Sequence, residues 1–264
     1  MIHHIDTLDD PRVDAFRRVG DHAWLRSQQM FVAEGRLLLE RLIAATYQMH
    51  SVLLSPAAMT ALGAMVSELE CPVYVAARQL LHEITGFNFH RGCLALAKRP
   101  TPYALEPHFA SRRLLGLEGI GNPDNIGGLF RSAAAFGADG VVLDEASGDP
   151  FYRKALRTSM GAILRIPFTR IADWVRTCGE FRDKGFLVAA LVVDPRAIAI
   201  DAIASGGTHR ERVLLLVGSE GAGLSEATQA AADVRVTIPM THRVDSLNVA
   251  VAASVAMSWI WRET

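Results

Sequence analysis

Residues 114 to 139 read LLGLEGIGNPDNIGGLFRSAAAFGAD, an apolar run followed by a glycine-rich turn and a segment of small residues. The apolar run predicts a buried strand, and the small residues predict a helix. A strand joined to a helix by a short turn is the unit of open α/β sheets, whose ligands gather at the carboxyl ends of the strands. The turn is therefore a candidate binding site.

This turn departs from the common nucleotide-binding loops. Gly119 and Gly121 match the first two glycines of the dinucleotide fingerprint, and Asp144 follows at about the expected 20 residues. The third glycine position, however, is Asp124, and Pro123 removes an amide that a pyrophosphate would need. A Walker loop would need GK followed by Ser or Thr, which the turn lacks. A dinucleotide site is therefore a minor alternative.

Arg131 is the unusual residue of the helix that follows the turn. Asp124 or Asn125 is expected to cap this helix, and Arg131 lies about a turn and a half further on, beside three alanines. In a helix of small residues that packs closely, an arginine is expected to reach an anion through its planar guanidinium.

The composition is that of a soluble globular protein. The 264 residues include 27 Lys and Arg against 28 Asp and Glu, a net charge of −1. Cys71, Cys93 and Cys178 have no metal-ligand spacing, so neither a zinc site nor a disulfide scaffold is expected. The start of the chain is polar, and the longest apolar run, 247–261, is shorter than the about 20 residues that cross a bilayer. We expect a cytoplasmic protein that uses no metal and no membrane.

Two stretches of this neutral chain are locally basic. Residues 150–172 carry five cations and no acidic residue: Arg153, Lys154, Arg157, Arg165 and Arg170. Residues 17–41 carry three acidic residues, Asp21, Glu34 and Glu40, and five arginines: Arg17, Arg18, Arg26, Arg36 and Arg41. Such stretches are either solvated faces or contacts to an acidic partner, and both interpretations stay open.

The chain predicts two α/β domains. Three prolines between residues 98 and 113 interrupt the pattern, so we place a smaller N-terminal domain and its linker at 1–105 and a larger domain at 106–264. The first alternates helical and apolar segments, from about residue 12 to residue 100. The second has unbroken aliphatic runs, typical of a parallel sheet covered on both faces, at 114–120, 140–144, 186–193, 212–218 and 234–239.

Two more turns follow strands of the second domain. In VLLLVGSEGAGLSEA (213–227), Gly218 ends a strand and lets the backbone approach a ligand, and Glu220 is either a helix-dipole partner or a site residue. A hydrolase elbow around Ser219 would need glycine where Val217 stands. In the segment from Ile238 to Trp261, Ser246 is expected to cap a helix whose first turn contains Asn248. Near its end, Trp259 and Trp261 are expected to form a subunit contact.

Together, NPDNIGGLFRSAAAFGA, VGSEGAGL and IPM…VDSLNVAVA resemble, in this order and spacing, the three signature motifs of the SpoU (TrmH-like) family of RNA 2'-O-ribose methyltransferases in the SPOUT superfamily. The resemblance covers about residues 112–262, and ALRTSMGAILRIPF resembles the segment between the first two motifs. The N-terminal part, with FVAEGRLLLERL and ITGFNFHRGCLALAKRP, is more loosely similar to the substrate-binding domain of ribosomal-RNA members.

This resemblance implies an α/β catalytic domain with a mostly parallel sheet and a deep trefoil knot, preceded by a smaller RNA-binding domain. It implies S-adenosyl-L-methionine as the cofactor, RNA as the substrate and a homodimer formed through the C-terminal domain. Ribosomal RNA is favoured over transfer RNA by analogy alone. The implied activity is methyl transfer to a ribose 2'-hydroxyl, and a non-catalytic RNA-binding protein that keeps the fold is the alternative.

Matching the motifs position by position assigns roles to single residues. The implied catalytic residues are Asn125, Arg131, Glu220, Ser246 and Asn248, and the implied cofactor contacts are backbone groups of Gly218, Ile238 and Leu247. One departure is His242, followed by Arg243, where family members usually carry glycine. We expect this side chain to point out of the cofactor slot. The family arginine is often described as the base, but a guanidinium stays protonated in nearly every protein setting, so we expect Arg131 to orient the substrate phosphate.

Overall fold

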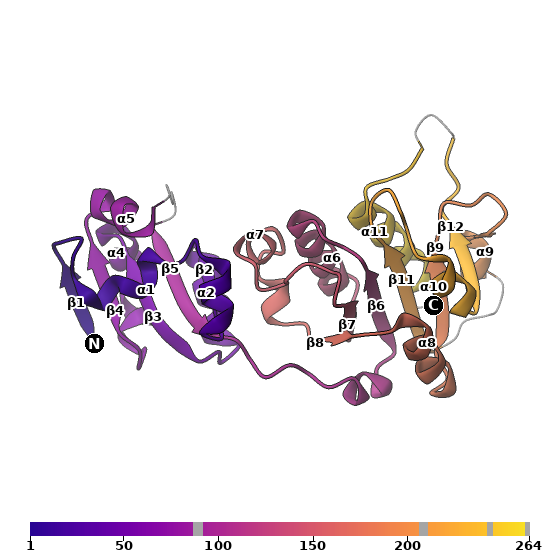
Figure 1. Ribbon diagram of the computed structural model, residues 1–264, viewed down its shortest axis with the longest axis horizontal. Helices are drawn as coiled ribbons and strands as arrows, with labels where there is room; N and C mark the ends of the chain where they lie inside the picture. Colours follow the sequence, from indigo (N-terminus) through magenta and orange to yellow (C-terminus); the bar gives the residue numbers. More distant parts are fainter. Residues whose placement is uncertain (87–91, 206–210, 242–244, 262–264) are drawn as a thin grey trace. The chain divides into compact units, whose positions relative to one another are not determined.

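The computed structural model describes residues 1–86, 92–205, 211–241 and 245–261 (Figure 1). The chain forms two compact units, Met1–Thr101 with Phe151–Leu164, and Pro102–Pro150 with Arg165–Thr264. The first division lies in the proline-rich stretch that suggested a boundary between residues 105 and 106. Nothing in the sequence indicated that Phe151–Leu164 packs with the first unit.

The first unit contains a mixed sheet in the order β1-β4-β3-β5-β2. Its strands are β1 (Ile2–Ile5), β2 (Met30–Glu34), β3 (Met49–Leu54), β4 (Val73–Ala76) and β5 (Cys93–Lys98). Its helices are α1 (Asp14–Arg17), α2 (His22–Ser27), α3 (Arg36–Ala44), α4 (Pro56–Ser67), α5 (Arg78–Thr85) and α7 (Arg153–Thr158), with short 3-10 turns at Pro11–Val13 and Ala162–Leu164. The strand β1 pairs in parallel with β4, so this domain begins about ten residues earlier than the helical and apolar pattern indicated.

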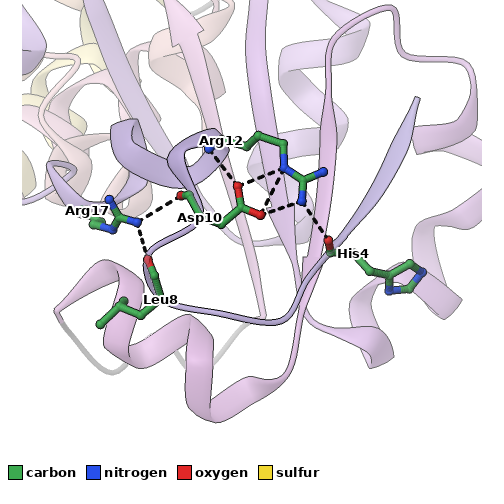
Figure 2. A network of polar contacts seen from close by, with 5 residues as sticks. All are labelled: His4, Leu8, Asp10, Arg12 and Arg17. Carbon is green, nitrogen blue, oxygen red and sulfur yellow. Dashed lines mark hydrogen bonds and ion pairs between the residues drawn. The ribbon is translucent and has the colours of Figure 1, made fainter.

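The start of the first unit is fastened by an arginine–aspartate network (Figure 2). The Arg12 guanidinium binds both carboxylate oxygens of Asp10, with Nη2 2.6 Å from Oδ2, and the Arg12 amide donates to the same carboxylate. Arg17 donates to the carbonyl oxygens of Leu8 and Asp10 from the far side of the loop. The network joins the loop after β1 to the 3-10 turn at Pro11–Val13 and to the last residue of α1.

Asp10 is expected to make the first unit sensitive to acid. The hydrogen bonds from Arg12 lower the pKa of Asp10 from its ordinary value of 3.8 to about 2. Because the pKa is lower in the folded state, the stabilisation is complete above about pH 4 and disappears as the pH falls through about 2. We expect Asp10→Asn to remove this part of the pH dependence, measured as the urea midpoint between pH 5 and pH 2. An unchanged acid dependence in the variant would contradict the assignment.

The second unit contains a parallel sheet in the order β10-β12-β9-β11-β6-β7-β8. Its strands are β6 (Arg113–Glu118), β7 (Gly140–Asp144), β8 (Phe168–Ile171), β9 (Leu187–Leu191), β10 (Ile198–Ala199), β11 (Val213–Gly218) and β12 (Val234–Thr237). Its helices are α6 (Pro123–Ala135), α8 (Trp174–Asp183), α9 (Ile200–Ser205), α10 (Glu226–Ala231) and α11 (Val249–Ile260), with a 3-10 turn at Glu106–Ala110. The expected α/β class and parallel sheet are confirmed, and β8 and β10 are additions.

Helices cover both faces of this sheet, which explains why most positions of its central strands are apolar. On one face, Trp174 and Phe181 of α8 pack against alternate residues of the strands, such as Leu114 and Leu216. The α6 and α11 helices cover the other face and pack against each other (Figure 1). No helix in the described part of the chain is both long and apolar enough to cross a membrane.

Candidate functional site

The site begins where β6 and β11 end side by side. The two strands are parallel, and Gly218 pairs with Glu118 in their register, so the turn after each strand leaves the sheet at the same edge. The first turn leads into α6, whose N-cap is Asn122, with its side chain accepting from the Asp124 amide. The prediction that Asp124 or Asn125 caps this helix is therefore wrong, because the helix begins at Pro123 and both residues lie within its first turn.

Three side chains from the three quoted motifs meet at this edge. The Asn248 amide nitrogen donates to Oδ1 of Asn125 at 2.9 Å and to Oε1 of Glu220 at 2.7 Å. Asn125 is buried in the first turn of α6, whereas Glu220 and Asn248 are exposed. Residues separated by more than a hundred positions thus form one hydrogen-bonded group, as the motif pattern predicted.

Asn248 can connect Asn125 and Glu220 because the oxygen and the nitrogen of its side-chain amide bind different partners. Its Oδ1 accepts from the backbone amides of Ala250 and Val251, so Asn248 is the N-cap of α11. The oxygen is fixed by the helix, and the NH2 end must therefore face the two acceptors, Asn125 and Glu220. Ser246, which we expected to be the cap, lies two residues before it.

An open pocket of about 1560 Å³ lies against this group. Its walls are the segments that follow β9, β11 and β12, the α10 helix, and the start of α11. The walls include six of the eight residues that the motifs singled out: Gly218, Glu220, Ile238, Ser246, Leu247 and Asn248. Ligand pockets usually measure roughly 300–1,000 Å³, so this one has room for a nucleotide-sized molecule and part of a second ligand.

Gly218 is needed because the turn after β11 folds back onto the strand. A Cβ atom at this position would lie 2.1 Å from the carbonyl carbon of Gly223 and 2.2 Å from the amide nitrogen of Leu224. The amide of Gly223 also donates to the carbonyl oxygen of Ser219. This tight turn presents backbone groups to the pocket, as the glycine pattern predicted.

Glu118 anchors the far end of the same turn, a contact that the sequence did not reveal. Its Oε2 accepts from the Ser225 amide at 2.9 Å, and its Oε1 accepts from the hydroxyls of Ser225 and Thr228 at 2.8 and 2.7 Å. Ser225 is the N-cap of α10, and Thr228 is buried. The carboxylate at the end of β6 therefore holds both the turn that carries Glu220 and the start of α10.

Asp194 contributes a fixed negative charge to the pocket wall. The side chain of Arg196 donates to its carboxylate at 3.1 Å, the Arg196 amide donates at 2.9 Å, and Arg235 lies 3.6 Å away. The hydrogen bond from the Arg196 side chain, followed by the one from its amide, lowers the pKa of Asp194. No sequence pattern distinguishes this residue, because an Asp after an apolar strand is common in loops.

Arg131 is exposed on α6 and is not part of the pocket wall. Within the described ranges, no hydrogen bond or ion pair involves its side chain. Next to Arg131, the Ser132 hydroxyl accepts a hydrogen bond from the Ser254 hydroxyl of α11 at 2.7 Å. A Cβ atom added at Gly128 would lie 3.0 Å from the Cβ of Ala250. The two helices thus pack closely along the stretch that separates Asn125 from Arg131, and they leave the guanidinium available for an external ligand.

Several cations of the two basic stretches have partners within the protein. Arg17, Arg18 and Arg36 pair with Asp14, Asp21 and Glu40. Arg153 and Arg157 of the first unit both lie within 4 Å of the buried carboxylate of Glu34. Arg170 donates to backbone carbonyls, as described below. Because these side chains are held by contacts within the protein, fewer cations are available to an acidic partner than the number of basic residues in the two stretches suggests.

The tryptophans at the end of the chain differ from each other. Trp261 is buried, so its expected role in a subunit contact is wrong, whereas Trp259 is 38% exposed. His242 and Arg243 lie outside the described residues. In the part of the chain that is described, no group of three His, Cys, Asp or Glu side chains could hold a metal ion.

Fold and site together define a class of protein. A parallel α/β unit with a pocket at the carboxyl ends of its strands is typical of proteins that bind nucleotide-sized ligands. The buried Asn125 amide, linked through Asn248 to the Glu220 carboxylate, supplies polar groups that can orient a ligand in such a pocket.

Comparison with known proteins gives the family. The SpoU rRNA Methylase family matches residues 112–258, and an uncharacterized tRNA/rRNA methyltransferase from Mycobacterium tuberculosis is 34% identical over 253 residues, covering 94% of this chain and 88% of that protein. The chain belongs to the SpoU rRNA Methylase family. The family resemblance of the three motifs is thereby confirmed.

Solved structures share the fold over both units. The AdoMet-bound rRNA methyltransferase of Sinorhizobium meliloti aligns with a TM-score of 0.83 at 22% identity, covering 98% of this chain and 97% of that one. The SpoU methyltransferase AviRb of Streptomyces viridochromogenes, in complex with AdoMet, aligns with a TM-score of 0.81 at 21% identity, covering 96% and 98%. At these identities the likeness establishes the α/β architecture.

Proposed function

We propose that this protein transfers a methyl group from S-adenosyl-L-methionine to a ribose 2'-hydroxyl of RNA, with ribosomal RNA as the favoured substrate. The observation that carries the proposal is the hydrogen-bonded group of Asn125, Glu220 and Asn248 beside a nucleotide-sized pocket in a SpoU-family chain. The methyltransferase names of the relatives and the AdoMet in two similar structures support it.

The pocket suits this cofactor in chemistry as well as size. Backbone groups of Gly218, Ile238 and Leu247 line it, and the close turn at Gly218 lets main-chain amides and carbonyls approach an adenosine. The carboxylate of Glu220, also in the wall, would attract the sulfonium cation of the bound cofactor, whereas the charge of Asp194 is balanced by Arg196 and Arg235. When bound, the cofactor supplies an already activated methyl group, so the reaction needs no metal.

The residues of the chain then have separate tasks. A ribose hydroxyl is a weak nucleophile near neutral pH, so its proton must be loosened and its oxygen held in line with the methyl group. Arg131 holds the phosphate beside the target ribose through its guanidinium, which stays protonated. Glu220, Ser246 and Asn248 hold the hydroxyl, and Asn125 fixes the Asn248 amide from its buried side.

The remaining parts of the proposal concern assembly and location. We propose a homodimer that uses the second unit, because Val251 and Trp259 of α11 are half and more than a third exposed. We also propose a trefoil knot in this unit, RNA binding by the first unit, and a cytoplasmic location. Transfer RNA is the second candidate substrate, since the names of the relatives include both RNAs.

The decisive experiment is tritium transfer from labelled cofactor into unmodified ribosomal and transfer RNA, followed by mapping of the labelled nucleotide. Label that resists alkali at one ribose supports the proposal. Label on a base, or none on any RNA, contradicts it. Calorimetry with the cofactor distinguishes the non-catalytic alternative, because an RNA-binding protein that lost the reaction would bind no cofactor at millimolar concentration.

Glu118→Gln is expected to weaken cofactor binding about tenfold, measured as Kd by calorimetry. The glutamine would place an NH2 group against groups that now donate hydrogen bonds to the carboxylate. Losing such hydrogen bonds costs about 1–3 kcal/mol, and each 1.4 kcal/mol changes Kd about tenfold. The control is Glu180→Gln, which removes the same charge from an exposed pair with Arg176. Equal Kd values for the two variants would show that Glu118 does not hold the pocket turn.

A further inference from the structure

The turn after β6 is held by the turn after β7. Both carboxylate oxygens of Asp144, the last residue of β7, lie within 3.1 Å of the Gly119 amide, which donates to them. The same carboxylate accepts from the amide of Ser147 at 2.8 Å. Asp144 therefore fixes the first residue of the turn that leads to Asn125.

Ser147 makes the second connection, from a buried position. Its Oγ accepts from the Ile120 amide at 3.0 Å and lies 2.6 Å from Oδ1 of Asp144. A hydroxyl has one proton, and the closer carboxylate is the stronger acceptor, so Ser147 donates to Asp144 and accepts from Ile120. Next to it, the Gly148 amide donates to the Ile120 carbonyl oxygen at 2.8 Å, and a Cβ at Gly148 would lie 3.0 Å from the carbonyl oxygen of Gly121.

Arg170 of the neighbouring strand β8 fixes the β7 turn from outside. Its Nη1 donates to the carbonyl oxygens of Asp144 at 2.6 Å and Ser147 at 3.0 Å, and its Nη2 donates to that of Gly148 at 2.8 Å. Arg170 thus binds the carbonyl oxygens of the same three residues that contact the β6 turn through the side chains of Asp144 and Ser147 and the amide of Gly148. Arg170 belongs to the basic stretch at 150–172, but its guanidinium is used for contacts within the unit.

We propose that Asp144, Ser147 and Arg170 are positioning residues for methyl transfer, which act by fixing the start of α6 and hence Asn125. This inference rests on the proposed function and extends it. The network holds the substrate side of the site, whereas Glu118 holds the cofactor side through a different turn. None of the three residues belongs to the pocket wall. Their loss should therefore slow the transfer step and leave cofactor affinity intact.

The test compares Ser147→Ala and Arg170→Met with wild type in single-turnover methyl transfer. Ser147→Ala leaves the buried Ile120 amide without its acceptor, and we expect a rate at least about tenfold lower, since displacements on the order of 1 Å can cost about 100-fold. Arg170 is exposed, so Arg170→Met should cost less, about threefold. In both variants the cofactor Kd should stay within about twofold of wild type, unlike Glu118→Gln.

Hydrogen exchange provides a measurement that does not depend on activity. The amides of Gly119 and Ile120, which donate to Asp144 and Ser147, should exchange faster in both variants, while those of 219–224 should not change. Arg170→Lys should recover part of the rate, because one ammonium can still donate to these carbonyls. Arg176→Met, which removes an arginine from an exposed ion pair, is the control and should match wild type.

The outcomes separate this inference from the proposed function. If wild type transfers methyl groups and both variants match it, the positioning role is wrong. If Ser147→Ala weakens cofactor binding as much as it slows transfer, the network serves the whole unit and the inference is also wrong. If wild type transfers no methyl group to any RNA, the proposed function fails, and unchanged exchange of the Gly119 and Ile120 amides would separately overturn the role of the network.

Discussion

Gly218→Ala is expected to weaken cofactor binding on the order of 100-fold, about 2.8 kcal/mol. The new methyl group would lie 2.1 to 2.3 Å from backbone atoms of Gly223 and Leu224, and these cannot move without displacing the turn that carries Glu220. Forcing an extra carbon into a packed site typically costs 1–3 kcal/mol or more, and here the relaxation would distort the pocket wall itself. Calorimetry with S-adenosyl-L-methionine measures the change.

Gly179→Ala is the matched control for this substitution. Gly179 lies on α8 of the same unit, and a Cβ there would meet no atom within 4 Å. Alanine in the middle of a helix is about 0.5–1 kcal/mol more favourable than glycine, so this variant should bind the cofactor as wild type does and melt slightly higher. If Gly218→Ala bound the cofactor normally, the pocket would not be the cofactor site.

Arg131→Lys is expected to lower turnover with RNA by about 10- to 100-fold. Lysine keeps the positive charge but loses the planar pair of donors that can bind two phosphate oxygens at once, and hydrogen bonds to charged groups contribute about 1.5–3 kcal/mol each. Because Arg131 is not part of the pocket wall, cofactor affinity should not change. The measurement is kcat and KM with RNA, beside a cofactor Kd.

The control for Arg131→Lys is Arg176→Lys, at an exposed ion pair on α8. It makes the same chemical change away from the site and should leave turnover unchanged. Near-full turnover by Arg131→Lys would contradict the orienting role and would show that this side chain contributes only its positive charge. A change in cofactor Kd would instead place Arg131 at the pocket.

Much of the second unit could be predicted from sequence because its central strands are long aliphatic runs. The runs at 140–144 and 212–218 match β7 and β11 within a residue, since few other arrangements bury such segments. The short strands β8 and β10 were missed, because Phe168–Ile171 and Ile198–Ala199 are too brief to show a pattern. In the first unit, β1 was missed because two histidines interrupt its apolar residues.

The candidate site was predicted as a set of residues, but its geometry was not. Motif matching named Asn125, Glu220 and Asn248, and the structure joins them by hydrogen bonds. The choice of helix cap was wrong at both α6 and α11, since several residues in each turn can cap equally well and tertiary contacts decide. The contacts of Glu118 and Asp144 join segments up to 110 residues apart, and no local pattern signals such pairs.

The strand register that pairs Gly218 with Glu118 also decides which changes in chain length the site can absorb. Residues added to the turn between α8 and β9, which lies outside the pocket wall, would leave both strand ends where they are. A single residue inserted within β6 or β11 would instead reverse which face each later side chain occupies and would shift one turn by about 3.3 Å along the other. Homologues of this chain should therefore tolerate changes of length in that turn and keep the lengths of these two strands fixed.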